Sequence, residues 1–433
     1  DPIDGNNYMT QVDMALMGGE KIDIYLPLDG LGKAVSSNKV ISLNDYLDNE
    51  LKETVDTIGE NYLRPSTYND NVYGIQTYRG NVMIYYWICD KELFDATGFS
   101  ADDIKNIRDL TPVLAKLKEQ NENIVPIAPS LGANNTPNSF NQLAILSARD
   151  DYEDVLIGSL NPLTCIEKDD LTIKNIYETD MFKEACELAY EWNQNGYVLP
   201  DASVATDAPY DLIKAGRAAS MTIGYAYGTE SVDEIMDAQC GKDIVAIPLC
   251  ETLLTPVTMY WSITQTCSNP EAAAKVLNMM FTNETVLNYI IFGVEGIDYV
   301  KGDVVDGIQT IKYPEGYDMS SVPYTEAYSC GIVGNQFIMY ALEGNTKAED
   351  IAFMKEKTET AKLSPIYGFD PDTTNVKTEQ SAIGNVVSQY ASGLLTGELD
   401  PEEYIPKMQE EMKDAGMDNF IAEVQTQLDA WEK

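Results

Sequence analysis

The sequence predicts a protein of the α/β class. At about 150 residues per domain, its 433 residues suggest two or three domains. Six apolar stretches have the length and composition of buried strands, at residues 22–26, 82–88, 124–127, 219–223, 244–247 and 259–264. Amphipathic helices lie between them, and strands that alternate with helices along a chain are typical of α/β domains.

The helices are expected from the spacing of their apolar residues and from their capping residues. They fall at residues 91–97, 107–120, 180–195 and 272–281, followed by a helical tail at 378–431. Apolar residues from Phe182 to Trp192 recur close to every 3.6 positions. Asn269 provides a cap, and Pro270 follows at the first helical position. The tail is expected to break at residues 397–401 and 415–416.

The charge balance excludes several classes of partner. The chain has 29 Lys and Arg against 70 Asp and Glu, a formal net charge of −41. Such a surface repels nucleic-acid phosphates and anionic lipid headgroups, so we expect no nucleic-acid partner. Histidine is absent, which excludes Ser-His-Asp catalysis and His-ligated metal sites.

Cysteine usage predicts free, buried thiols. The seven cysteines, none in a CxxC pair, are Cys89, Cys165, Cys186, Cys240, Cys250, Cys267 and Cys330. The acidic stretch Asp370-Pro371-Asp372 lacks the glycine and the closing glutamate of an EF-hand loop. We therefore expect no metal site and no cofactor. No run of 18 apolar residues is present, so no membrane span is expected.

Aromatic residues beside predicted strand ends suggest a sugar-binding surface. Tyrosine occurs 27 times, and the apolar face of a pyranose stacks on such rings while polar neighbours bind its hydroxyls. The aromatic candidates, on strands or in the loops after them, are Trp87, Tyr225, Tyr227, Trp261, Tyr367 and Phe369. The alternative for each is that its ring fills the core.

Arg79 is a further candidate, as a donor to a hydroxyl or carboxylate. The alternative is a surface salt bridge. Carboxylates are so frequent that no acid/base pair can be chosen from the sequence. The sequence also contains no GxSxG, P-loop or GxGxxG context.

Several short segments match one known family in order and spacing. They include MGGEKIDI at 17–24, YNDNVYGI at 68–75, LIKAGRAASMTI at 212–223, SNPEAAAKVLNMMF at 268–281 and GVEGIDY at 293–299. Gln76 stands where the family has proline. Read in order, the segments resemble the extracellular solute-binding proteins of ABC importers, in the class that includes maltose-binding protein. The C-terminal third is similar to a branch of surface lipoproteins in Gram-positive bacteria.

The resemblance implies a type II periplasmic-binding-protein fold, with two α/β lobes joined by hinge crossovers and a helical C-terminal tail. Lobe 1 would contain residues 1–79 and 259–315, and lobe 2 residues 80–258 and 316–433. The family has a strand, a helix and another strand ahead of the segment that begins at Met17, so we expect lobe 1 to lack its first strands.

The resemblance also implies a ligand site in the cleft between the lobes. Its residues would be Asp29, Arg79, Trp87, Asn135, Phe140, Tyr225, Tyr227, Trp261, Tyr367 and Phe369. Asp29 would accept hydroxyl hydrogen bonds, Tyr225 and Tyr227 would form a sugar platform, and Asn135 and Phe140 lie where the family often has cleft contacts.

The implied function is capture of an oligosaccharide and its delivery to ABC transporter permease subunits, without catalysis. The protein would be extracellular and monomeric, anchored by a lipid on a cysteine that this chain does not contain. Two alternatives stay open at this point. One is a glycoside hydrolase or other carbohydrate-active enzyme, which would need two carboxylates facing one site. The other is a peptide or amino-acid-derivative binder on the same fold.

Overall fold

The chain divides into two compact units, each made of two separate stretches of sequence. The computed structural model describes residues 7–131, 137–149, 152–156, 164–167, 171–252, 254, 259–327, 331–369 and 371–431. Unit 1 comprises Asp1–Val82 and Leu254–Leu363, and unit 2 comprises Met83–Leu253 and Ser364–Lys433. The chain therefore passes from one unit to the other at three points along the sequence.

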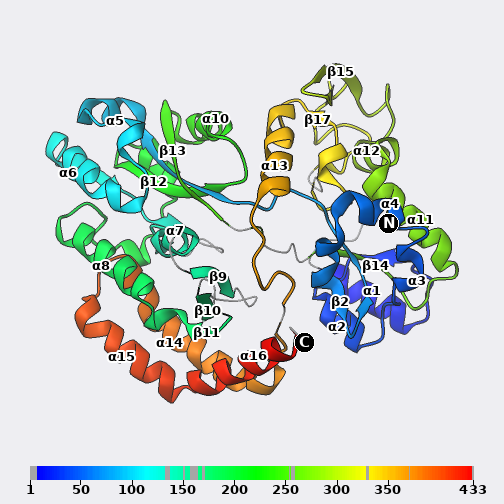
Figure 1. Ribbon diagram of the computed structural model, residues 1–433. Coiled ribbons are helices and arrows are strands. Elements are labelled where there is room, and N and C mark those ends of the chain that lie inside the picture. Colours follow the sequence, from blue (N-terminus) through cyan, green and yellow to red (C-terminus); the bar gives the residue numbers. More distant parts are fainter. Residues whose placement is uncertain are drawn as a thin grey trace. The chain divides into compact units, whose positions relative to one another are not determined.

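A four-stranded sheet forms the centre of unit 2 (Figure 1). Its strands, in spatial order, are β13 (Ile244–Glu251), β5 (Ile84–Asp90), β12 (Ala218–Tyr225) and β6 (Val125–Ile127). β5 is antiparallel to both of its neighbours, whereas β12 and β6 are parallel. The carboxyl ends of β13, β12 and β6 therefore lie at one edge of the sheet, beside the amino end of β5. We call this the carboxyl edge of unit 2.

The composition of β5 explains its central position. Its sequence, IYYWICD, is rich in aromatic and β-branched residues, which favour strands. Tyr86, Trp87, Ile88 and Cys89 are all buried. A strand that is covered on both faces reads as a continuous apolar run, as β5 does.

Helices cover the sheet of unit 2. They are α5 (Lys91–Thr97), α6 (Leu110–Gln120), α7 (Gln142–Arg149), α8 (Asp180–Gln194), α9 (Pro209–Lys214) and α10 (Thr229–Cys240). Helices α5, α6 and α8 share one hydrophobic core with Trp87 and Cys89 of β5, and α9 and α10 contact β12 and β13. The Thr179 hydroxyl accepts the Phe182 amide at 3.2 Å and so caps α8.

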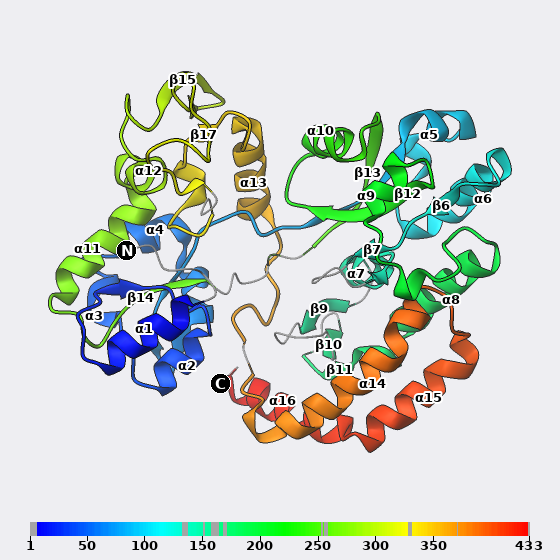
Figure 2. The same cartoon turned by 180° about the vertical axis from the view of Figure 1, so that it is seen from behind.

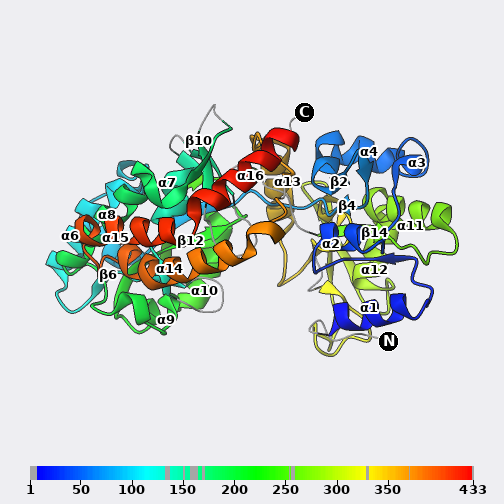
Figure 3. The ribbon, with the colours of Figure 1, turned by 90° about the horizontal axis from the view of Figure 1, so that it is seen from below.

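The C-terminal helices pack beside α8 (Figure 3). They are α14 (Lys377–Leu395), α15 (Pro401–Asp414) and α16 (Met417–Trp431). The first break falls at Gly397, which has a φ of 76°, and the second at Gly416, with a φ of 98°. Strands β9 (Tyr152–Leu156), β10 (Thr164–Glu167) and β11 (Ile173–Asn175) form an antiparallel sheet that α16 contacts. The predicted α/β class with a helical C-terminal end is confirmed.

Unit 1 contains a smaller sheet in the order β1-β14-β4. Its strands are β1 (Ile24–Tyr25), β14 (Tyr260–Ile263) and β4 (Ile75–Gln76), and β14 is antiparallel to both neighbours. The surrounding helices, visible in Figure 2, are α1 (Tyr8–Met17), α2 (Leu31–Ser36), α3 (Asn44–Leu47), α4 (Lys52–Ile58), α11 (Pro270–Thr282) and α12 (Glu284–Phe292). Pro270 and the Asn269 cap open α11 as the sequence predicts.

A second sheet of unit 1 lies later in the chain. It consists of β15 (Val300–Val305), β16 (Ile308–Lys312) and β17 (Ala341–Leu342), followed by α13 (Ala348–Thr360). Because β17 pairs in parallel with β16 and α13 contacts β16, residues 316–363 belong to unit 1. This differs from the predicted boundary after residue 315, whereas the boundaries predicted at 79/80 and 258/259 lie close to those observed.

Six cysteines lie in the described part of the chain, and all but the half-buried Cys267 are buried. Cys330 lies outside the described residues. Burial raises the pKa of the Cys89 thiol, which keeps it protonated and unreactive at neutral pH. Among the helices that the structure describes, none is both long and apolar enough to cross a membrane.

Candidate functional site

Two stacked tyrosines lie at the carboxyl edge of unit 2. β12 ends at Tyr225, and Tyr227 follows in the loop before α10. Their ring centroids are 5.9 Å apart, with an interplanar angle of 22°. Both side chains are half-buried, so part of each ring remains accessible. We call these two residues the tyrosine pair.

The tyrosine pair is held from the central strand and from α10. The hydroxyl of Tyr86 in β5 donates to the carbonyl oxygen of Tyr227 at 2.7 Å. Burial raises the pKa of Tyr86 to about 12, so this hydroxyl stays a donor at neutral pH. Burial also raises the pKa of Tyr225, whose hydroxyl hydrogen-bonds the Gln239 side chain of α10. Tyr227 is therefore held at its backbone carbonyl and Tyr225 at its hydroxyl.

A hydrogen-bond network links β12 to the segments that follow β6. Ser130 donates to the Thr222 carbonyl oxygen at 2.6 Å, and the Thr222 hydroxyl donates to the Phe140 carbonyl oxygen at 2.7 Å. The amide of Asn141 donates to the Ser130 hydroxyl at 3.2 Å. Asn141 has a φ of 55°, a conformation that Asn tolerates better than most residues. The network joins β12 to the segment after β6 and stiffens the carboxyl edge.

Three of the predicted site residues lie in unit 1. Trp261 is on β14, Asp29 follows β1 and Arg79 follows β4. Trp261 of β14 pairs with Ile75, and its half-buried indole donates to the Ile332 carbonyl oxygen at 2.9 Å. Asp29 follows β1, with its carboxylate 2.5 Å from Lys33 Nζ. Arg79 follows β4 and is half-buried against Gly331. Asp29 is therefore ion-paired within its own unit.

Three predicted site residues lie in the packed interior of unit 2. Trp87 is 0% exposed and meets Phe94 edge-on, with ring centroids 5.5 Å apart. Phe140 is also 0% exposed, against Trp192, and Tyr367 is 1% exposed. These rings contribute to the core, which was the alternative for each aromatic residue, and we do not carry them into the proposed site.

The two remaining predicted site residues, Phe369 and Asn135, add no support for a ligand site. Phe369 is half-buried against Trp431, with ring centroids 5.7 Å apart, and packs onto the core of unit 2. Asn135 lies outside the described residues. Of the predicted set, the structure thus brings together Tyr225 and Tyr227 in unit 2.

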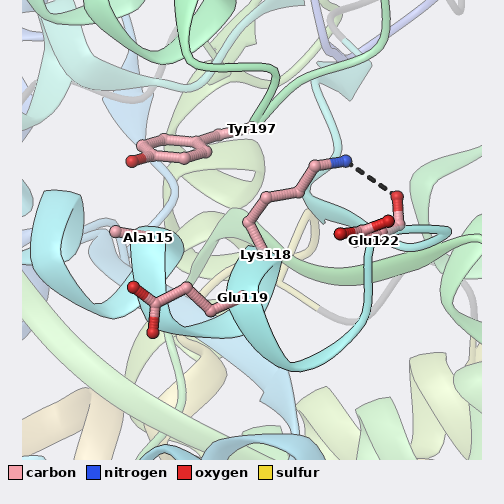
Figure 4. A pocket seen from close by; sticks show the side chains of 5 residues that line it. All are labelled: Ala115, Lys118, Glu119, Glu122 and Tyr197. Carbon is pink, nitrogen blue, oxygen red and sulfur yellow. Dashed lines mark hydrogen bonds between the residues drawn. The ribbon is translucent and has the colours of Figure 1, made fainter.

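A surface pocket elsewhere in unit 2 does not match the predicted site. Figure 4 shows its lining, which consists of Ala115, Lys118, Glu119, Glu122 and Tyr197. Lys118 Nζ donates to the Glu122 carbonyl oxygen at 2.9 Å. The pocket is open to solvent and lies on α6, which precedes the amino end of β6, so it is remote from the carboxyl edge. Within the described residues, no three His, Cys, Asp or Glu side chains gather closely enough to hold a metal ion.

The sequence reasoning missed Ser130, Thr222 and Asn141. Thr222 lies within β12, Ser130 begins the short strand β7 (Ser130–Leu131), and Asn141 directly precedes α7. Small polar residues such as these are a weak marker of a functional site in a sequence, because they also occur in ordinary turns.

The chain has the type II periplasmic-binding-protein fold, with two α/β units each built from separate sequence stretches. The chain belongs to the bacterial extracellular solute-binding protein family, whose model matches residues 1–286. A domain of unknown function matches residues 365–433, which include the C-terminal helices.

The chain is similar to several known proteins over almost its whole length. A carbohydrate ABC transporter substrate-binding protein of Streptococcus pneumoniae serotype 4 is 25% identical over 99% of this chain and 83% of its own. The N-glycan transport solute-binding protein NgtS of Streptococcus pneumoniae superposes with a TM-score of 0.74, at 22% identity, over 98% of this chain and 89% of its own. An extracellular solute-binding protein of Bifidobacterium longum subsp. infantis superposes with a TM-score of 0.68, at 15% identity, over 99% of this chain and 91% of its own.

Proposed function

We propose that this protein is the solute-binding component of an ABC importer and that its solute is an oligosaccharide. Membership of the extracellular solute-binding family supports the transport role. The relative from Streptococcus pneumoniae serotype 4 is a carbohydrate transporter component, and NgtS has been solved in complex with Man1GlcNAc and with Man5GlcNAc.

The observation that carries the proposal is the tyrosine pair. The apolar face of a sugar ring packs on an aromatic face, and a buried contact of this kind contributes about 1–3 kcal/mol. Tyr225 and Tyr227 offer such faces at the edge of the sheet where ligands of α/β proteins bind.

The remaining parts of the proposal concern the setting of the protein. It binds the sugar without breaking a bond, as expected for a family of transport proteins, and passes it to the permease subunits of its transporter. It works outside the cell as a monomer, held at the membrane by a lipid on a cysteine that lies outside this chain.

Replacing Tyr227 tests the proposal directly. The Tyr227→Ala variant should bind its best neutral oligosaccharide about 5- to 150-fold more weakly, which corresponds to about 1–3 kcal/mol. Calorimetric titration against a panel of glycans measures the change in affinity, and a thermal melt of the same sample reports stability.

Tyr197→Ala is a matched control, since this tyrosine is also half-buried in unit 2 but follows α8 and lines the separate surface pocket beside α6. Its affinity should be unchanged. If Tyr227→Ala keeps full affinity while its melting temperature falls, Tyr227 is a packing residue and the proposed site is wrong. Release of shortened sugars at enzyme-like rates would instead point to a hydrolase.

A further inference from the structure

An exposed methionine lies at the carboxyl edge of unit 2. Met83 directly precedes β5 and is 38% exposed. Two other large apolar residues are exposed in the described part of unit 2, Val204 and Tyr210, and both come before the amino end of β12. Single exposed apolar residues are ordinary on protein surfaces, so the surroundings of Met83 decide whether it has a role.

Two hydrogen bonds to Thr252 fix the backbone of Met83. The Met83 amide donates to Thr252 Oγ1 at 3.0 Å, and the Thr252 amide donates to the Met83 carbonyl oxygen at 2.8 Å. Since Thr252 directly follows β13, these bonds extend the pairing of β5 with β13 by one residue. The backbone is therefore held at the edge, while the flexible thioether side chain can adapt to a ligand.

Gly224 of β12 leaves its backbone bare beneath the Met83 side chain. A Cβ added at Gly224 would lie 3.0 Å from both Cγ and Sδ of Met83 and 3.4 Å from Cε1 of the Tyr85 ring. Gly224 is opposite Tyr85 in the register of β12 and β5. The side chain of Met83 thus packs over a residue without a side chain, next to the ring of Tyr85.

This apolar surface lies on the other face of the sheet from Tyr225. Tyr225 is opposite Ile84, the next pair along the two strands. Opposite residues point to the same face, and successive residues alternate between faces. The carboxyl edge therefore offers apolar side chains on both faces, and a ligand with more than one sugar ring can cross the edge and contact both.

Tyr85 adds a polar group to this surface. It is half-buried, and burial raises the pKa of its hydroxyl. The hydroxyl therefore stays protonated at neutral pH and can donate or accept a hydrogen bond. A thioether beside a tyrosine hydroxyl suits an acetamido group, which has a methyl to bury and an amide to hydrogen-bond. A sugar hydroxyl in the same place has no apolar part.

We infer that Met83, Gly224 and Tyr85 form a subsite for the acetamido group of an N-acetylated sugar, with Met83 as the residue that sets this preference. Met83 contacts the methyl group, and Tyr85 hydrogen-bonds the amide. The inference rests on the proposed function, because it names the class of sugar that the same edge of the sheet accepts.

The test uses glycans that differ only in the acetamido group. One pair is chitobiose and cellobiose, and the other is mannosyl-N-acetylglucosamine and mannosyl-glucose with the same linkage. Calorimetry gives the ratio of affinities within each pair. It is applied to the native protein, to Met83→Gln and Met83→Leu, and to Gly224→Ala, whose added methyl displaces the Met83 side chain. Met14→Gln is the matched control, since Met14 is an exposed methionine of α1 in unit 1.

The native protein should bind the acetamido member of a pair about 4- to 20-fold more tightly, from one buried methyl and one hydrogen bond. Met83→Gln and Gly224→Ala should each lower this ratio by about 3- to 5-fold, because each removes the apolar contact with the methyl. Met83→Leu, which stays apolar, and Met14→Gln should keep the native ratio. Thermal melts of the same samples check that every variant is folded.

Three results would overturn the inference while leaving oligosaccharide binding intact. The first is that the native protein binds neutral glycans without preferring the acetamido member of either pair. The second is that the preference survives in Met83→Gln, and the third is that it falls equally in Met14→Gln. Failure to bind any member of a broad panel of neutral glycans is a different result. It would reject the proposed function, and the inference would fall with it.

Discussion

Tyr86 links the interior of unit 2 to its proposed binding edge. Its ring is buried in the central strand, and its hydroxyl reaches the carbonyl oxygen of Tyr227. A buried hydroxyl with a good acceptor resists ionisation, which explains the raised pKa. One residue thus couples the packing of the sheet to the backbone of Tyr227 at the carboxyl edge.

This coupling predicts how stability depends on alkaline pH. The pKa of Tyr86 is about 12 in the folded protein against 10.0 ordinarily, so the folded state binds this proton more tightly. The contribution is fully present below pH 10 and is lost as pH rises through 12. Urea unfolding at several pH values from 8 to 11 should show a decline in stability that is shallower in Tyr86→Phe. If stability fell equally with pH in the native protein and in Tyr86→Phe, the raised pKa of Tyr86 would be contradicted.

Among the elements, the turn between α14 and α15 packs unusually close to α8. A Cβ added at Gly397 would lie 2.1 Å from the carbonyl oxygen of Ala189, and the φ of Gly397 is 76°. Only glycine meets both conditions without strain. This contact between backbones fixes the C-terminal helices against the core of unit 2.

Gly397→Ala should therefore lower the free energy of unfolding by about 2–4 kcal/mol, combining backbone strain with overpacking. Gly384→Ala is the matched control, since Gly384 lies within α14 with no atom within 4 Å of an added Cβ. That change should stabilise by about 0.5–1 kcal/mol, because alanine favours helices. Denaturant unfolding measures both. If both variants lost a similar amount of unfolding free energy, the effect would not be specific to the turn at Gly397.

Strand β5 shows why the sequence alone could not sort the predicted site residues from the core. The strand prediction at 82–88 overlaps β5, yet it could not tell that Trp87 is fully buried whereas Tyr225 is half-buried. β5 is buried on both faces, so its side-chain alternation carries no polar marker that distinguishes core from edge. Tyr225 and Tyr227 lie where a strand passes into a loop, and that position was visible in the sequence.

At the scale of the whole molecule, the boundaries between units were predictable only in part. The first two follow strands that resemble a known family, and they fall close to the observed ones. The third depends on β17, a two-residue strand that pairs with β16. Such a short strand has no periodicity from which its partner could be inferred, so residues 316–363 were assigned to the other unit.

The net charge of −41 leads to a prediction for the whole protein. Repulsion among like charges opposes the compact state, and salt screens it. The melting temperature should therefore rise when NaCl is increased from 0.01 M to 0.5 M, and KCl should give the same rise at equal concentration. A shift with one cation only would indicate specific ion binding in place of screening, and a fall would contradict the prediction.

The late return of the chain to unit 2 has a consequence for biogenesis. Residues Met83–Leu253 are synthesised before Ser364–Lys433, yet helices from this later stretch cover the apolar side of α8. Unit 1 residues Leu254–Leu363 must emerge from the ribosome before that cover exists. During synthesis, part of the core of unit 2 is therefore exposed to water until the C-terminal helices have been made. In this interval it is a natural client for chaperones, which bind exposed apolar surface.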